Sequence, residues 1–187
     1  MIPISYPSAM IAITVAWILA RAAVCRITGR LSWKREAQLI LVYISIVVVA
    51  RFTFFPFSKV DGKVQPLLFD GAKMFPPRIN LIPFVNLLDY PDPREAVLNV
   101  VGNTTMFLPM GILWPIVYRE LNTHRKVIAA GIGISGCIEI LQLPFFDRVT
   151  DIDDLILNSL GFLAGYGLYL GGKGCCSLAR RRRHKEQ

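Results

Sequence analysis

The sequence predicts an all-α fold, a polytopic transmembrane bundle of about five spanning helices. Hydrophobic residues make up 53% of the 187 residues and charged residues only 18%, with a mean hydropathy of +0.47. Soluble domains of this size do not carry that balance. The second observation is a series of apolar stretches that approach the roughly 20 helical residues needed to cross a hydrocarbon core of about 30 Å.

The expected helices, in order, are Pro7–Ile27, Ala37–Phe57, Ala96–Tyr118, Val127–Phe146 and Leu155–Gly172. The first is expected to be retained, because no basic residues precede it and no A-x-A-like cleavage signal follows it. The last three stretches contain interior polar residues, so we assign them as helices from their length and from the charged residues that flank them. We expect residues 1–187 to form a single membrane domain, with residues 173–187 as a basic cytoplasmic tail.

The long connection Ser58–Arg94 is rich in proline and glycine. Within it, Asn80–Leu88 is apolar but too short to span a bilayer. Pro83 disfavours a continuous helix there, because proline lacks a backbone donor. We therefore expect Asn80–Leu88 to form an outer cap or a re-entrant segment at the membrane surface.

Basic residues mark three regions that are predicted to be cytoplasmic: the first connection, the third connection and the C-terminal tail. These residues are Arg26, Arg30, Lys34 and Arg35, then Arg119, Arg125 and Lys126, and finally Arg180 to Arg183 with Lys185. The N-terminus is then outside and the C-terminus inside. Topology and attraction to anionic lipid headgroups account for the net charge of +8, and no nucleic-acid partner is expected.

Polar residues from several helices are predicted to share one depth near the outer face. At about 1.5 Å per helical residue, Glu139 lies roughly 18 Å above the inner end of its helix. Polar groups are costly in lipid, so their convergence indicates a site. The candidate binding residues are Arg51, Asn80, Asn99, Asn103, Glu139, Gln142, Arg148, Asp151, Asp153, Asp154 and Asn158.

Two groups of these residues have alternative interpretations. Glu139 is expected to pair with an arginine, with Arg51 favoured over Arg148, and guanidinium groups also suit phosphate or carboxylate ligands. Asp151, Asp153 and Asp154 resemble oxygen ligands for a divalent cation. The preferred alternative is that one aspartate caps the last helix. No other metal site and no other cofactor are expected.

Small residues at helical spacing predict close helix packing without chemistry. Gly161 and Gly165 form a G-x-x-x-G pattern, and Gly131 with Ser135 forms a second small-residue pair.

The ordered motifs resemble the signature of the VanZ-like family over roughly Arg51 to Gly165. The motifs are Asn80–Phe84, Gly102–Asn103 followed by Phe107, Pro109 and Gly111, then Ser135, Glu139 and Gln142, and finally Arg148, Asp151, Asp153, Asp154, Asn158 and Gly161. The resemblance implies an integral protein of the bacterial cytoplasmic (inner) membrane, linked to resistance to the glycopeptide teicoplanin. It implies no particular reaction.

Two functional hypotheses follow, with a purely architectural cluster as the third. In the first, an outward-facing polar cavity binds or shields a lipid-linked or lipidated amphiphile of the cell envelope. In the alternative, the protein is an intramembrane hydrolase or transferase that acts on a lipid-linked substrate, with Glu139 or Asp154 as acid/base. Both histidines, His124 and His184, belong to the inner side, which disfavours a Ser-His-Asp triad.

Overall fold

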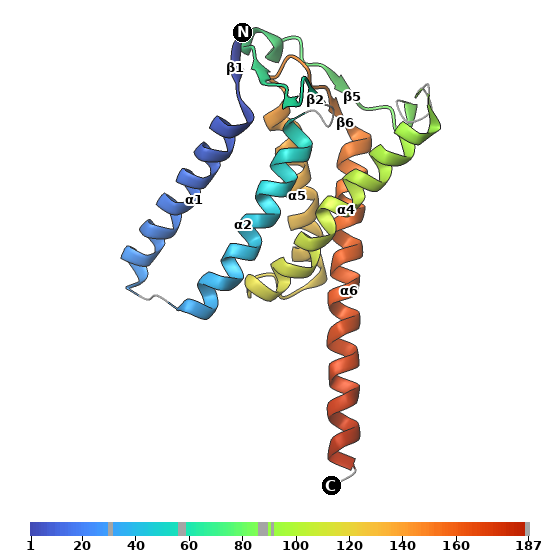
Figure 1. The fold of residues 1–187 in the computed structure, drawn as a ribbon. Coiled ribbons are helices and arrows are strands. Elements are labelled where there is room, and N and C mark those ends of the chain that lie inside the picture. The colour runs from blue at the N-terminus through green and yellow to red at the C-terminus, as the bar shows by residue number, and fades with distance from the viewer. Residues whose placement is uncertain (30–31, 56–58, 86–89, 91, 186–187) are drawn as a thin grey trace.

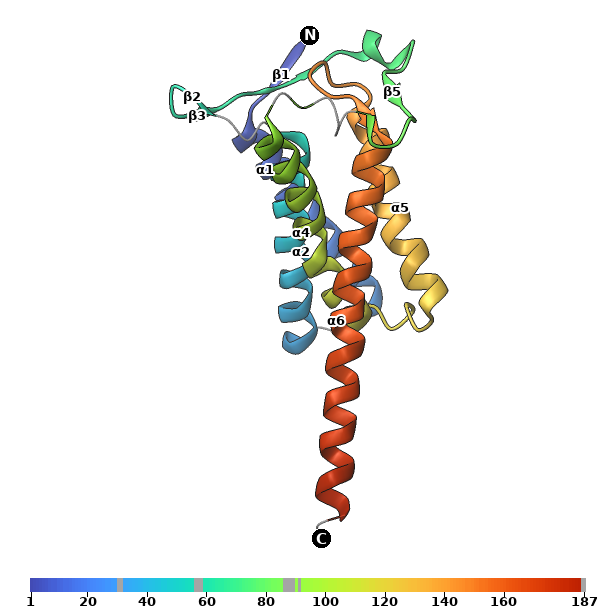
Figure 2. The same cartoon turned by 90° about the vertical axis from the view of Figure 1, so that its right-hand side faces the viewer.

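The computed structural model describes the chain except residues 30–31, 56–58, 86–89, 91 and 186–187. The described residues form five long helices that run side by side (Figures 1 and 2). They are α1 (Tyr6–Thr28), α2 (Trp33–Phe54), α4 (Pro93–Val117), α5 (His124–Gln142) and α6 (Ile152–Lys185). Each predicted apolar stretch overlaps one of these helices over most of its length, so the prediction of an all-α membrane bundle is confirmed.

Four of the described helices are long and apolar enough to cross a membrane: α1, α2, α4, and α6 as far as Cys175. The remaining helix, α5, has 19 residues and includes Arg125, Lys126 and Glu139. The chain ends lie at opposite ends of the bundle (Figure 1).

The helix ends follow local sequence signals. Ser5 caps α1, Asp92 caps α4 and Thr123 caps α5, each accepting a backbone N–H with its side-chain oxygen. The helix α5 stops at Gln142, short of the predicted Phe146, because Pro144 supplies no backbone donor. By contrast, α6 begins before the predicted Leu155 and continues to Lys185, so the basic tail extends the helix.

Short strands build a lid over the end of the bundle that holds the N-terminus (Figure 2). The strand β1 (Ile2–Ile4) pairs antiparallel with β4 (Leu67–Phe69), and β2 (Lys59–Val60) with β3 (Lys63–Val64). The turn between β2 and β3 is Asp61-Gly62, both with positive φ, as a tight hairpin turn requires. A 3-10 helix, η1 (Gly71–Met74), follows. Finally, β5 (Ile79–Asn80) pairs parallel with β6 (Thr150–Asp151).

The helices α4 and α6 both start at the lid and pack in direct backbone contact. A Cβ atom on Gly161 would collide with the carbonyl of Thr104, and one on Gly165 with that of Leu108. Gly111 meets the backbone of Phe162 in the same way. The predicted G-x-x-x-G packing is confirmed.

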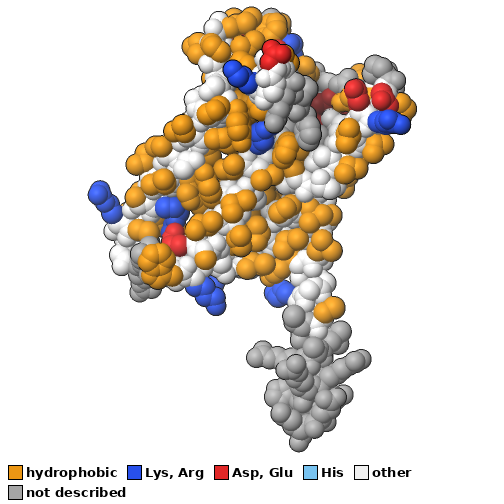
Figure 3. Space-filling view, viewed as in Figure 1, with side chains coloured by type: hydrophobic (Ala, Val, Ile, Leu, Met, Phe, Trp, Pro, Cys, Tyr) orange, Lys and Arg blue, Asp and Glu red, His pale blue; other side chains and the backbone are white. Residues whose placement is uncertain are grey.

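The helix α5 packs closely against α6 at Gly131. A Cβ atom added there would lie 2.7 Å from the ring of Phe162, which belongs to α6. Phe162 is fully buried and belongs to the main apolar core with Phe107, Met110 and Val49. Hydrophobic side chains cover most of the helix flanks (Figure 3), as expected for surfaces that face lipid.

Candidate functional site

The predicted site residues gather beneath the lid, where α5 ends and α6 begins. Because β5 pairs with β6, Asn80 lies beside Asp151 and donates from Nδ2 to Oδ1 of that carboxylate over 3.2 Å. The backbone N–H of Phe84 donates to Oδ1 of Asp153 over 2.7 Å. The lid segment Asn80–Phe84 is thus attached to the start of α6, and residues 86–88 of the predicted cap lie outside the described residues.

Phe84 holds an unusual backbone conformation, with φ +66°. Left-handed backbone costs a non-glycine residue about 1–3 kcal/mol and persists where the surroundings impose it. The hydrogen bond to Asp153 is one such constraint. The side chains of Leu81, Ile82 and Phe84 are exposed, so an exposed apolar segment borders the polar residues Asp151 and Asp153.

Glu139, in α5, is 4% exposed. Its Oε2 accepts from the backbone N–H of Asp151 over 3.0 Å, and its main-chain oxygen accepts from the hydroxyl of Thr150 over 2.8 Å. Oε1 has no hydrogen-bond partner among the described residues. The predicted pairing of Glu139 with Arg51 is wrong for the described part of the chain, because a backbone amide takes the place of the guanidinium.

Arg51 and Arg148 both donate hydrogen bonds to backbone carbonyls at the C-terminal end of α2. Arg51 donates to the carbonyl of Phe55 over 3.2 Å, and Arg148 donates from Nε to the carbonyl of Phe54 over 3.3 Å. Gln142 adds a third donor, 2.9 Å from the carbonyl of Thr53. The last carbonyls of a helix lack partners within it, and positive charge there is favourable. These three residues therefore stabilise the bundle, whatever else they do.

Arg148 lies outside the spanning helices and is partly buried. Burial lowers the pKa of its guanidinium, while the charges of Asp154 and Asp147 act in the opposite direction. The charge of Arg148 thus partly compensates the acidic start of α6.

The three aspartates point to different partners. Asp151 is the N-cap of α6, with Oδ1 accepting from the backbone N–H of Asp153 over 3.0 Å, so the capping interpretation is confirmed. Asp154 accepts from Nδ2 of Asn103 over 2.6 Å. The described residues contain no group of three His, Cys, Asp or Glu side chains placed to hold a metal, and the divalent cation stays a prediction.

A chain of amides extends from Asp154 along α4. Asn103 also donates to Oδ1 of Asn99 over 3.3 Å, and Asn99 donates to the hydroxyl of Tyr90 over 3.2 Å. Burial and the charge of Asp154 raise the pKa of that hydroxyl. Sequence reasoning missed Tyr90 and Thr150, since neither belongs to a helix and no periodicity singles them out.

Several buried polar atoms near the lid end have no hydrogen-bond partner among the described residues. They include Oε1 of Glu139, Oε1 of Gln142, Oδ2 of Asp153, the hydroxyl of Ser135 and both amide atoms of Asn158. Asn158 and Ser135 are completely buried. Buried polar groups in folded proteins are nearly always paired, and each unpaired group costs about 1–3 kcal/mol. The site therefore has capacity for water or for a polar ligand.

Apolar helices around a partly unsatisfied polar cluster define an integral membrane protein with a candidate binding site at one end of its bundle. The family profile of VanZ/LLP1 matches residues 40–175, which include all eleven candidate residues. The chain belongs to the VanZ-like family. Among curated proteins, it is 33% identical over 91 residues to Protein VanZ of Enterococcus faecium.

That alignment covers 49% of this chain and 52% of Protein VanZ. The chain thus spans about half the length of that relative. No solved structure matches the chain.

Proposed function

We propose that the lid-end site binds the polar head of an amphiphilic cell-envelope ligand from the outer side of the membrane, and that this binding contributes to glycopeptide (teicoplanin) resistance. The observation that carries the proposal is the set of buried, unpartnered polar atoms beside an exposed apolar lid segment. A ligand with a polar head and an apolar tail complements both features.

The unpartnered atoms define the chemistry of the head. Glu139, Gln142 and Asp153 each contribute an oxygen without a donor, so a ligand rich in hydroxyl, amide N–H or ammonium donors complements them. A purely anionic head fits less well, because Arg51 and Arg148 already donate to the carbonyls of α2. Sugar- and peptide-bearing lipids of the cell envelope, and lipidated antibiotics of similar chemistry, have the required donors.

The lid supplies the apolar contact. Leu81, Ile82 and Phe84 are 70%, 65% and 53% exposed, and they follow one another closely in the segment that Asp151 and Asp153 hold. Exposed apolar residues grouped in this way favour contact with a membrane or an apolar ligand.

The orientation follows from charge. Lys34, Arg35, Arg119 and Arg125 lie at the end of the bundle opposite the lid, so the positive-inside rule places that end in the cytoplasm and the lid outside. Termini at opposite ends require an odd number of crossings, and we propose that α5 completes five. The membrane is the bacterial cytoplasmic (inner) membrane.

The link to resistance rests on family membership and on the similarity to Protein VanZ. Its test is the minimal inhibitory concentration of teicoplanin for a susceptible host that expresses the chain. The informative variant is Glu139→Gln with Asp153→Asn. Each amide retains one oxygen for the structural bond to Asp151 or Phe84, but it can present an NH2 donor where the carboxylate has an unpartnered acceptor.

We expect the unmodified chain to raise the inhibitory concentration and the double variant to lose the effect at equal membrane abundance. Glu95→Gln is the matched control, because Glu95 lies near the same end in the exposed first turn of α4. Full protection by the double variant would refute the site. If the double variant instead accumulates an unprocessed lipid-linked substrate, Glu139 has an acid/base role as in the alternative enzyme hypothesis.

A further inference from the structure

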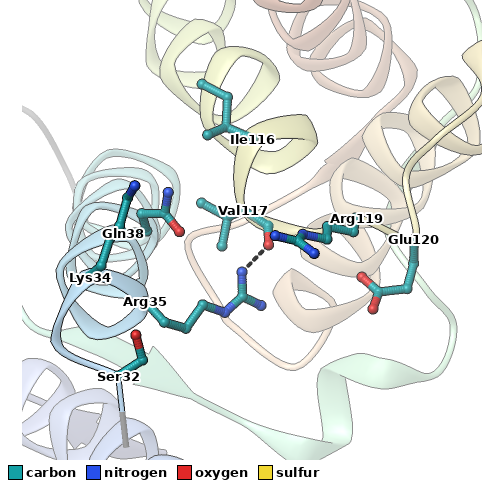
Figure 4. Close-up of a pocket in the computed structure, with 8 residues that line it drawn as sticks. All are labelled: Ser32, Lys34, Arg35, Gln38, Ile116, Val117, Arg119 and Glu120. Carbon is teal, nitrogen blue, oxygen red and sulfur yellow. Dashed lines mark hydrogen bonds between the residues drawn. The ribbon is translucent and has the colours of Figure 1, made fainter.

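A second polar site lies at the other end of the bundle. There, a pocket of about 440 Å³ opens between the start of α2 and the end of α4, a volume within the range of ligand sites. Its polar lining residues are Ser32, Lys34, Arg35, Gln38, Arg119 and Glu120 (Figure 4). None of them belongs to the lid-end site.

We propose that this pocket binds the phosphate of an anionic phospholipid headgroup. Its lining has three cationic side chains and one carboxylate. Lys34 and Arg119 are exposed, and no hydrogen bond or ion pair to another described residue engages either side chain. The nearby carboxylate of Glu36 forms an ion pair with Arg21 over 2.5 Å instead. The pocket therefore keeps an excess of positive charge.

The arrangement of the two guanidinium groups favours an anion. Arg35 donates from Nη1 to the carbonyl of Val117, at the last turn of α4, which fixes its head at the pocket. Arg119 projects toward the same carbonyl from the other side (Figure 4). Converging like charges repel each other, and a phosphate between them would replace that repulsion with charge-assisted hydrogen bonds.

The start of α2 adds donors. Ser32 is the N-cap residue, but its side chain accepts no capping hydrogen bond. The first backbone N–H groups of a helix have no partner within it, and they attract phosphate oxygens. Three lining residues of the pocket, Ser32, Lys34 and Arg35, belong to this N-cap and first turn.

The surroundings of the pocket place it at the depth of lipid headgroups. Trp33 is 82% exposed beside the pocket, and Tyr118 follows α4 directly. Tryptophan and tyrosine are enriched at the membrane–water interface. Apolar Ile116 and Val117 complete the wall. This position favours a phosphate carried by a lipid over a free ion, and basic pockets between membrane helices commonly take such headgroups.

The test is native mass spectrometry of the full chain in detergent with equimolar phosphatidylglycerol and phosphatidylcholine. We expect the unmodified chain to retain phosphatidylglycerol preferentially. The variant Lys34→Gln with Arg119→Gln should retain about tenfold less, because two charge-assisted contacts are lost. The matched control is Arg26→Gln with Arg125→Gln, which removes the same charge from exposed positions outside the pocket.

Three results would overturn the proposal: equal retention of the two lipids by the unmodified chain, an equal loss in the control, or retained preference in the pocket variant. Lys34→Arg with Arg119→Lys keeps both charges and should retain the lipid. Its failure to do so would also count against the proposal, provided circular dichroism shows that the variant is folded.

In a further measurement, millimolar inorganic phosphate is added to the chain with its bound lipid. We expect it to leave the bound phosphatidylglycerol in place. If inorganic phosphate displaces the lipid and stabilises the unmodified chain but not the pocket variant, the site is for a free anion and the lipid assignment is wrong.

Discussion

The carboxylate of Glu139 reaches from α5 to the backbone amide of Asp151, with 3.0 Å between Oε2 and the nitrogen. This contact joins the end of α5 to the strand that precedes α6. The second oxygen of the same carboxylate has no partner among the described residues. One side chain thus contacts the lid strand and keeps a second oxygen for the ligand that we propose.

The close contact of α4 with α6 predicts that Gly161→Ala destabilises the bundle. The added methyl group would collide with the carbonyl of Thr104, and overpacking of this kind costs about 1–3 kcal/mol. Gly167→Ala is the control on the same helix, where nothing lies within 4 Å of the new Cβ. In thermal unfolding in detergent, Gly161→Ala should lower the midpoint and Gly167→Ala should not. Equal midpoints would contradict the packing.

Capping of α2 by distant side chains predicts a loss of stability in Gln142→Leu. The carbonyl of Thr53 would lose its 2.9 Å donor, and a buried carbonyl without a partner costs about 1–3 kcal/mol. Gln38→Leu, at the other end of α2 and partly exposed, is the comparison. Denaturant or thermal unfolding in micelles measures the difference, and equal stability of the two variants would refute the capping role.

The register of the lid predicts a specific cross-link. Ile79 lies opposite Thr150 in the parallel pair of β5 with β6, and neighbouring strands are about 4.8 Å apart, within reach of a disulfide. In a cysteine-free background, the pair Ile79→Cys and Thr150→Cys should cross-link under mild oxidation. The pair Ile79→Cys and Val149→Cys should react more slowly, because Val149 is out of register. The opposite order of rates would contradict the pairing.

The proposed orientation predicts which positions a membrane-impermeant thiol reagent can modify. Asp70→Cys, in the lid, should react in intact cells, whereas Lys173→Cys, near the end of the candidate membrane span of α6, should react only after permeabilisation. Both are introduced into the cysteine-free chain. The reverse pattern would place the lid in the cytoplasm and remove the outward site.

Sequence patterns were sufficient to find each helix, because apolar length, proline and capping residues act locally, but they did not fix the ends of α5 and α6. The contact between Asn80–Phe84 and the start of α6 was also predictable, since both segments were assigned to the outer face. The partner of Glu139 was not predictable, because a backbone amide leaves no trace in composition. The same holds for Arg51 and Arg148, whose acceptors are carbonyls at the end of α2, and for Tyr90, whose role depends on a loop path.

The measurement that tests ligand binding most directly is native mass spectrometry of the chain purified from bacterial membranes without added lipid. We predict a co-purified amphiphile with a sugar- or peptide-bearing head. Its occupancy should fall about tenfold in Glu139→Gln with Asp153→Asn, as expected when hydrogen bonds to charged groups are lost, and stay unchanged in Glu95→Gln. Equal occupancy in all three proteins, or no such ligand on the unmodified chain, would contradict the proposed site.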